Sequence, residues 1–473
     1  MGTAHTIDFI EDEEFVNLFS KRPETIKPGL ERIRPAWSKL GMNHYPQLNI
    51  LIGGTNGKGS TAGFLWHLLA AHGVKAGLFT SPHLCLFQER FQCTHEPIRQ
   101  SDLKRSLNEL RESLEENLYA ELSFFEVSTL LALKIFNERA CTVNILEVGL
   151  GGRLDSTNIV NPSISVVCSI DLDHTEWLGS TLTDIAEEKL GICRKEVPLF
   201  WGEQQTEEKG LLNTLSETQK KLGMPIYTRN MHFGLDLKSQ KAWTKFGESS
   251  NKTKIPIWVQ NSSDVIKQNF ALAYGVYSFI KQETKVLSPL REINPIACFS
   301  SPDLPWPPSL VGRFQELKVN KHIGDSFNIF LDVCHNPAAA REFVATFKKR
   351  EHTDKIPGFV SILNDKDIVQ ILNILREVLE PIYFFKVRSE RTNLDSSKGH
   401  FVNESFSVFA DLKSAWMEGK KLNQYNNYAI CGSFFAVADA LKLFSAYPED
   451  GYFTSSLQGI WTDNLEDLNF QFK

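Results

Sequence analysis

The chain has 473 residues, too many for one ordinary domain, so two domains are expected. Hydrophobic residues make up 42% and charged residues 23%, which is typical of a soluble globular protein, and the net charge of -6 gives no support to a nucleic-acid partner. The eight cysteines show no metal-binding spacing and are interpreted as reduced. No signal segment or membrane span is recognisable, so we expect no membrane partner and a cytoplasmic location.

The first half of the chain alternates short apolar runs with helical stretches. Strands are predicted over residues 48–52, 75–80, 142–148, 164–170 and 197–201. Helices are predicted over residues 60–71, 101–118, 124–138 and 181–194, which is the rhythm of a parallel sheet with crossover helices. The more polar region that follows has weak strands near 225–233 and 255–260, and then a helix from Asp264 to Gln282.

Residues 294–311 contain five prolines, which predicts a linker and a domain boundary. Beyond it the alternation resumes, with strands near 327–333, 357–363, 381–387, 406–409 and 427–431. The intervening helices are predicted near 337–350, 367–379, 411–419 and 434–445, which suggests a second open α/β sheet. The tail 447–473 has no clear period and stays unassigned.

A glycine-rich loop, residues 54–60, directly follows the strand 48–52. Its glycines let main-chain N–H groups close on phosphate oxygens, Lys58 adds positive charge, and Ser60 offers a hydroxyl at the start of a helix. The spacing departs from the common phosphate loop, because two residues separate Gly54 from Gly57 and Gly59 precedes Ser60. The alternative is a glycine-rich turn with a solvated lysine. We therefore predict an α/β protein with an N-terminal P-loop ATPase domain and a C-terminal Rossmann-like domain.

Two further polar residues follow neighbouring predicted strands. Glu147 ends the strand 142–148, where a carboxylate lies at the ligand-binding edge of a parallel sheet and suits Mg²⁺. His174 follows the next strand and could meet the same metal, with Asp173 orienting it. The alternatives are a turn-stabilising glutamate and a structural histidine. By composition alone, Lys189 is interpreted as a solvated surface lysine.

Many ordered segments resemble the folylpolyglutamate synthase and dihydrofolate synthase family of the Mur ligase superfamily. The resemblance is closest to its bacterial bifunctional type and runs from about Leu30 to Val437. It rests on residues 29–33, 54–60, 80–84, 89–90, 124–126, 147–158, 173–179, 188–191, 269, 312–313, 332–337, 365–367 and 432–433. It implies a Mur-ligase-type ATPase and folate-binding domain over 1–295, a linker over 296–311 and a second Mur-ligase-type domain over 312–473.

The resemblance implies a ligase in which ATP phosphorylates a substrate carboxylate and the amino group of L-glutamate then displaces the phosphate. The implied ATP contacts are Thr55, Asn56, Gly57, Lys58, Gly59, Ser60, Asn269, Arg313 and Asp332. Two Mg²⁺ ions are implied at Ser81, Glu147, His174 and Lys189, with Lys189 carbamylated so that its amine becomes an oxygen ligand. The implied catalytic residues are Lys189, His174 and His335.

The implied carboxylate substrates are dihydropteroate and the reduced folates, extended at the γ-carboxylate. By resemblance the pterin contacts Gly29, Leu30, Ser123, Phe124, Phe125, Glu126, Leu154, Asp155 and Ser156. Aromatic faces can stack on a flat heterocycle, although Phe124 and Phe125 could equally be core residues. The family expectation for the oligomeric state is a monomer.

Several features separate the chain from the family pattern or leave alternatives open. Val333 and Cys334 stand where Gly and Ala are usual, and Ser123 and Ser156 stand where Thr and Ala are commoner. A monofunctional member, with one of the two activities, remains an alternative. A Mur-type peptide ligase fits the chemistry but carries a separate N-terminal domain before its phosphate loop. A catalytically inactive ATP-binding homologue is the rival outside the enzymes.

Overall fold

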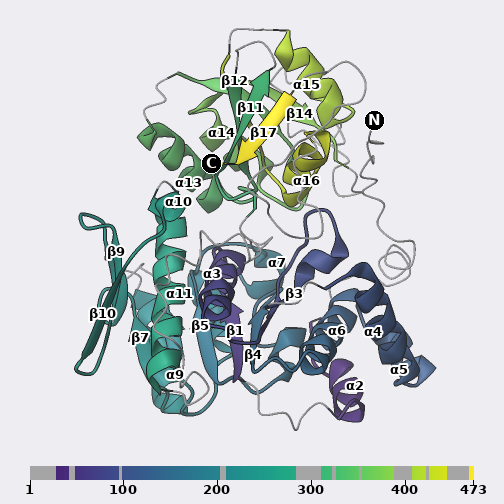
Figure 1. The fold of residues 1–473 in the computed structure, drawn as a ribbon, viewed down its shortest axis with the longest axis vertical. Coiled ribbons are helices and arrows are strands. Elements are labelled where there is room, and N and C mark those ends of the chain that lie inside the picture. Colours follow the sequence, from purple (N-terminus) through teal and green to yellow (C-terminus); the bar gives the residue numbers. More distant parts are fainter. Residues whose placement is uncertain are drawn as a thin grey trace. The chain divides into compact units, whose positions relative to one another are not determined.

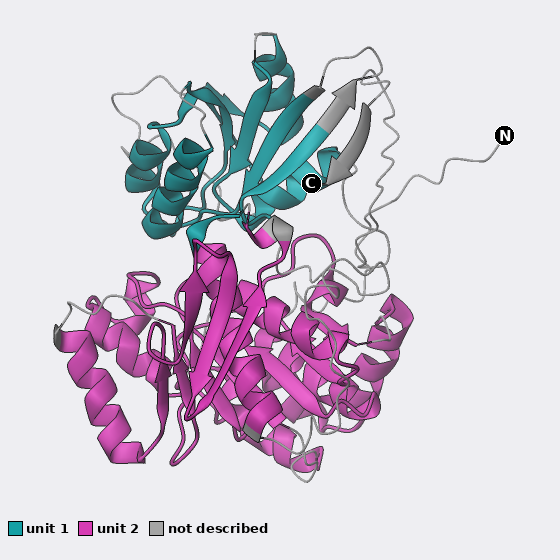
Figure 2. Cartoon of the chain, turned by 60° about the vertical axis from the view of Figure 1, so that its left-hand side comes forward, with its two compact units in different colours: residues 1–9, 261–264, 311–473 teal, residues 10–260, 265–310 magenta. Residues whose placement is uncertain are grey.

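A computed structural model describes residues 28–41, 48–94, 98–202, 209–260, 262–283, 311–321, 326–350, 354–387, 407–421, 425–444 and 468–472. The chain divides into two compact units (Figure 2). The N-terminal unit comprises residues 10–260 and 265–310, and the C-terminal unit comprises residues 1–9, 261–264 and 311–473. The expected linker, residues 296–311, lies outside the described residues except for Val311.

The N-terminal unit is built on a seven-stranded sheet (Figure 1). Its order is β3-β2-β4-β1-β5-β6-β7, and every pair of neighbours is parallel except β2 and β3. The strands are β1 (Leu48–Gly53), β2 (Ala76–Phe79), β3 (Phe91–Cys93), β4 (Val143–Glu147), β5 (Ile164–Val167), β6 (Leu199–Trp201) and β7 (Ile226–Thr228). The predicted mainly parallel sheet is therefore confirmed.

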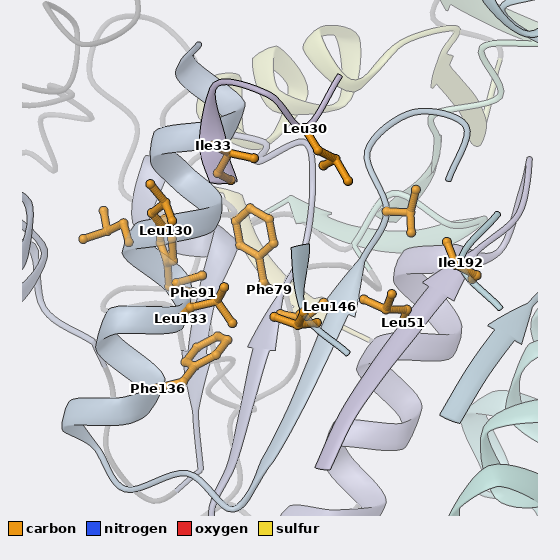
Figure 3. Close-up of a cluster of buried hydrophobic side chains, with 14 of the residues drawn as sticks. Leu30, Ile33, Leu51, Phe79, Phe91, Leu130, Leu133, Phe136, Leu146 and Ile192 are labelled. Atoms are coloured by element: carbon orange, nitrogen blue, oxygen red, sulfur yellow. The ribbon is translucent and has the colours of Figure 1, made fainter. Parts of the chain in front are cut away.

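Helices cover both faces of this sheet because successive strand residues point to opposite sides. Leu51 belongs to one buried cluster, with α4 (Gln100–Glu112), α6 (Phe124–Glu138) and α8 (Leu182–Leu190). Its neighbours Ile50 and Ile52 belong to the other cluster, with α3 (Lys58–Ala71) and α11 (Asp264–Glu283). In Figure 3, Leu130 and Phe136 of α6 lie beside residues of the sheet such as Phe79. The remaining elements are α2 (Ile33–Lys39), α5 (Glu116–Glu121), α7 (Thr175–Leu178), α9 (Lys209–Leu222), and the 3₁₀ turns η2 (Phe87–Arg90) and η3 (Ser156–Ile159).

Some predicted elements of this unit are wrong. The single helix expected over 101–118 is two helices, α4 and α5. The strand expected near 255–260 is the short helix α10 (Ile257–Gln260), in which the carbonyl of Pro256 accepts a hydrogen bond from Gln260 N at 3.0 Å. A three-stranded antiparallel sheet, β8 (Phe233–Asp236), β9 (Lys241–Phe246) and β10 (Ser249–Lys254), was largely missed. The sequence of β10 is polar throughout, so its pairing with β9 rather than an apolar pattern defines it as a strand.

The C-terminal unit has a second seven-stranded sheet, in the order β15-β14-β13-β16-β12-β11-β17. Its strands are β11 (Gln315–Lys321), β12 (Ser326–Asp332), β13 (Ile356–Val360), β14 (Leu379–Phe385), β15 (Ser407–Phe409), β16 (Asn427–Cys431) and β17 (Leu468–Phe472). Its helices are α13 (Pro337–Lys349), α14 (Ile368–Leu375), α15 (Leu412–Lys420) and α16 (Phe434–Leu443). The open α/β sheet was predicted, whereas antiparallel β11 and β17 were not.

Among the helices of the described ranges, none has both the length and the apolarity that a bilayer crossing requires.

Candidate active site

The glycine-rich loop connects β1 to α3 in the N-terminal unit, as predicted. Gly54 and Gly57 have positive φ angles of 138° and 85°, which L side chains rarely adopt. The loop is fixed to the segment after β5, because Thr55 N donates to Ser169 O at 2.8 Å and Asn56 N donates to Ser169 Oγ at 2.9 Å. Ser169 is a supporting residue that the motif itself did not indicate.

The first turn of α3 has backbone N–H groups that precede its intrahelical hydrogen bonds. Bonding to the preceding turn begins with Thr61 N, which donates to Gly57 O at 2.9 Å. In helix geometry the N–H groups of Lys58, Gly59 and Ser60 precede the first bond to a preceding turn, so this end of α3 suits an anion. The Lys58 side chain folds back over the loop, and its Nζ donates to Gly54 O at 2.9 Å and to Thr55 O at 3.0 Å. The loop is thus closed and cationic.

Glu147 ends β4 beside β2, and its carboxylate is buried. Its Oε2 accepts a hydrogen bond from Ser81 N at 3.0 Å, so two of the predicted metal ligands lie together. Burial raises the pKa of the Cys168 thiol to about 11, and both Lys58 and Glu147 act on this thiol electrostatically. Glu147 therefore lies within electrostatic range of the region around the phosphate loop.

His174 stands at the start of α7 with a left-handed backbone, φ 50° and ψ 40°. The backbone N–H of His174 donates to Asp173 Oδ1 at 2.9 Å, and the imidazole Nε2 lies 4.0 Å from Asp173 Oδ2, beyond hydrogen-bond distance. Asp173 is therefore adjacent to the imidazole, which is half-buried, and its orienting role stays a prediction.

Lys189 lies in the last turn of α8 and is only 4% exposed, so the interpretation from composition as a solvated lysine is wrong. Burial and the positive charge of Lys58 lower the pKa of its ammonium to about 7, and Asp173 opposes the shift. Lys189 is thus within electrostatic range of both the phosphate loop and the carboxylate beside His174. The neutral form of its amine is therefore favoured relative to that of an exposed lysine.

The glycines after β4 explain how the end of α8 reaches this position. Arg153 N donates to Glu188 O at 2.8 Å. A Cβ on Gly152 would stand 2.8 Å from Glu188 O and 2.9 Å from Lys189 O. Only a residue without a side chain permits this approach, so the turn sequence holds the backbone of Lys189 in place.

The predicted pterin-binding residues come from three separate segments that the fold brings together. Gly29 N donates to Leu154 O at 3.3 Å, and Leu30 is buried in the core. The hydroxyl of Ser156 lies 2.6 Å from that of Thr129 on α6, the helix that follows its N-cap Ser123. Phe125 approaches Gly149 so closely that a Cβ there would stand 2.6 Å from its ring.

The two aromatic residues of this region are only partly buried, although both pack against the core cluster. The guanidinium of Arg90 lies over the ring of Phe124 at 5.1 Å, and the Phe125 ring is 5.7 Å from that of Phe79. Arg90 also donates through Nε to His83 Nδ1 at 2.9 Å. The expected binding residues did not include Arg90, although it belongs to one of the resembling segments.

The carboxylate of Asp155 accepts hydrogen bonds from the backbone of its own turn. Its Oδ2 accepts hydrogen bonds from Gly149 N and Leu150 N, each at 3.0 Å, and its Oδ1 accepts from Thr157 N at 2.9 Å. Burial raises its pKa, and these hydrogen bonds oppose the shift. Asp155 therefore shapes the turn after β4.

In the C-terminal unit, Asp332 ends β12 and accepts hydrogen bonds from Phe314 N at 2.6 Å and from Cys334 N at 2.7 Å. Burial raises its pKa to about 6, and Arg313 opposes that shift. Phe434 lies beneath the Arg313 guanidinium at 5.2 Å, and its ring centroid is 5.8 Å from that of His335. Arg313, Asp332 and His335 are thus neighbours, and the bulkier Val333 and Cys334 are accommodated in the buried core.

Among the described residues, no three or more His, Cys, Asp or Glu side chains gather in a group that could hold a metal. The candidate donors at the sheet edge are of mixed type: the Ser81 hydroxyl, the Glu147 carboxylate, the His174 imidazole and the amine of Lys189. A hard cation such as Mg²⁺ accepts such a sparse set because it keeps several water ligands. The buried Glu147 carboxylate fits this cation, whereas the unmodified amine of Lys189 is not a ligand that it prefers.

The two α/β units and the phosphate loop after β1 are those of an ATP-dependent ligase of the Mur ligase type, as the following comparisons show. No protein-family model matches the chain. The dihydrofolate synthase/folylpolyglutamate synthase of Escherichia coli K12 is 31% identical over 437 residues, covering 92% of this chain and 95% of that protein. The chain belongs to the dihydrofolate synthase/folylpolyglutamate synthase family.

Solved structures agree with this placement. E. coli FolC in complex with DHPP and ADP has a TM-score of 0.74 at 28% identity, covering 92% of this chain and 97% of that chain. A bifunctional folylpolyglutamate synthase/dihydrofolate synthase with Mn, AMPPNP and L-glutamate bound has a TM-score of 0.72 at 28% identity, covering 88% of this chain and 94% of that chain.

Proposed function

We propose that this protein joins L-glutamate to dihydropteroate, giving dihydrofolate, and also to the γ-carboxylate of tetrahydrofolates. ATP phosphorylates the substrate carboxylate, and the glutamate amine then attacks the acyl phosphate and releases phosphate. The observation that carries this proposal is that the buried Lys189 lies within electrostatic range of Lys58 of the phosphate loop. Relatives that bind ADP with DHPP, or AMPPNP with L-glutamate, support the same substrates.

We assign the ATP phosphates to Thr55, Asn56, Gly57, Lys58, Gly59 and Ser60, with Asn269 against the loop. Arg313 and Asp332 are proposed for the phosphates and ribose of the nucleotide, and His335 for the reacting phosphate. Negative charge accumulates on the transferring phosphoryl group, and fixed cations stabilise it with little reorganisation. The corresponding domains are proposed to span residues 1–295 and 312–473.

Lys189 is proposed to be carbamylated and, with Ser81, Glu147 and His174, to hold two Mg²⁺ ions. Carbon dioxide adds to a neutral amine, so the lowered pKa of Lys189 favours this modification. The bound cations would offset charge on the phosphates and on the leaving oxygen. Asp173, which contacts His174, would fix the imidazole in its orientation.

The pterin is proposed to lie against Phe124 and Phe125, bounded by the backbone of Gly29, Leu30 and Leu154 and by Ser123, Glu126, Asp155 and Ser156. Partly exposed aromatic rings suit a flat heterocycle. A monomer in the cytoplasm is proposed. The described cysteines are buried and form no disulfide with one another, which agrees with a reducing compartment.

The decisive experiment is mass spectrometry of products after incubation with ATP, Mg²⁺ and L-glutamate, with dihydropteroate in one tube and tetrahydrofolate in another. Dihydrofolate in the first and a diglutamate in the second would support the bifunctional enzyme. One product alone would leave a monofunctional member. Neither product, with ATP still bound, would favour a catalytically inactive homologue.

A further inference from the structure

Arg32 and Glu126 form a close ion pair between two segments assigned to the pterin site. Arg32 Nε donates to Glu126 Oε2 at 3.2 Å, and Arg32 Nη2 lies 3.1 Å from Glu126 Oε1. The Glu126 side chain is 3% exposed and that of Arg32 is 24% exposed. This two-point contact fixes both side chains more tightly than a single-point pair would.

Glu126 has a second task at the start of α6. Its Oε2 also accepts a hydrogen bond from Ser123 N at 2.7 Å, and Ser123 Oγ accepts one from Glu126 N at 3.3 Å. This reciprocal arrangement caps the helix that begins with Phe124. Over the described ranges, the buried Oε1 accepts no hydrogen bond, although Arg32 Nη2 lies beside it. This oxygen is buried, and the neighbouring Arg32 guanidinium offsets its negative charge.

Arg32 also follows directly on the segment that contacts the turn after β4. Gly29 N donates to Leu154 O at 3.3 Å, and Arg34 N donates to Leu30 O at 3.0 Å at the start of α2. The ion pair therefore connects residues 29–33 to residues 123–126, while the Gly29 hydrogen bond connects them to residues 154–156. The three segments of the proposed site share this connection.

We propose that Arg32 is a positioning residue of the pterin site. It holds the Glu126 carboxylate, and with it the capped start of α6 that carries Phe124 and Phe125, against the Gly29–Leu30 segment. This proposal rests on the proposed function, because it assumes that the site takes a pterin. Arg32 itself need not touch the substrate.

The test compares Arg32→Gln, Arg32→Lys, Glu126→Gln and the Arg32→Gln/Glu126→Gln double variant in the full-length protein. We expect Arg32→Gln to raise the KM for dihydropteroate about 10- to 100-fold, since small displacements at a binding site have effects of this size. The KM for ATP and the kcat should stay close to wild type. Arg32→Lys should recover part of the lost dihydropteroate affinity, because lysine keeps the positive charge but lacks the paired N–H donors of the guanidinium. The two single effects should be strongly non-additive.

The matched control is Lys39→Gln. Lys39 lies on α2 and pairs with Glu115 at 2.6 Å, but both partners are exposed. It should change neither KM. Direct fluorescence titration with dihydropteroate, without turnover, should show the same order of affinities as the KM values.

Three results would overturn the proposal. The first is an unchanged dihydropteroate affinity in Arg32→Gln. The second is a rise in the KM for ATP as large as that in the KM for dihydropteroate, together with a loss of thermal stability, because this would indicate a merely structural role. Failure of the wild type to bind dihydropteroate is the third. If the wild type binds dihydropteroate but forms no product, the proposed function fails while the titrations still decide the role of Arg32.

Discussion

The side-chain amide of Asn269 lies so close to Gly57 that a Cβ at Gly57 would stand 2.6 Å from Asn269 Oδ1. Gly57 also has a φ of 85° at the start of α3. Gly57→Ala is therefore expected to displace the loop or the amide and to weaken ATP binding at least about 10-fold, which corresponds to roughly 1.4 kcal/mol. Isothermal titration with ATP measures this loss.

Gly73→Ala is the control for backbone strain, because Gly73 follows the same helix with a φ of 73° and open space around its missing Cβ. It should cost about 1 kcal/mol of stability and leave ATP affinity unchanged. Equal loss of ATP affinity in both variants would mean that the contact with Asn269 is unimportant.

Lys189→Ala should abolish ligation and leave the fold intact, because the side chain is proposed as a metal ligand rather than a packing residue. Product formation and the thermal melting curve are measured together. Added short carboxylic acids should partly restore activity by supplying the missing carboxylate. Full activity in Lys189→Ala would exclude the assigned role.

The pKa of Lys189 also predicts a pH dependence. Burial lowers this pKa to about 7, so the neutral amine that reacts with carbon dioxide is lost as the pH falls through about 7. In buffer freed of bicarbonate, activity should fall more steeply below pH 7 than in buffer with bicarbonate. Identical profiles in the two buffers would argue against carbamylation.

Asp332 predicts a separate pH effect on nucleotide binding. Burial raises its pKa to about 6, so the carboxylate proposed to accept a ribose hydroxyl is protonated as the pH falls through about 6. The ratio of ATP affinities between wild type and Asp332→Asn should therefore shrink below pH 6. This ratio is the proper measure, because protonation of ATP itself affects both proteins equally. A constant ratio from pH 5 to pH 8 would contradict the prediction.

Removal of divalent cations should stop product formation, and added Mg²⁺ should restore it. Glu147→Gln keeps an oxygen for the Ser81 N–H but loses a negative charge, so it should need a higher Mg²⁺ concentration for half-maximal activity. Glu115→Gln, at the exposed residue directly before α5, should leave the Mg²⁺ requirement unchanged. The measurement is the initial rate as a function of Mg²⁺ concentration for the wild type and the two variants.

The sequence by itself determined those features that depend on neighbouring residues in the chain. The apolar run before Gly54 and the glycines after it predicted β1, the phosphate loop and α3, because loop conformation and helix start depend on neighbouring residues. The ordered motifs indicated the family. Polar β10 and the distant strand β17 carried no comparable signal, because their pairing partners define them.

Only the tertiary structure decided which distant residues meet. Composition made Lys189 a surface lysine, yet the close approach of Gly152 and the packing of α8 bury it near Lys58 and Asp173, where desolvation lowers its pKa. Likewise, nothing in the local sequence pairs Arg32 with Glu126, which are separated by 94 positions. Burial and electrostatic proximity are properties of the packed chain, so no short stretch of sequence determines them.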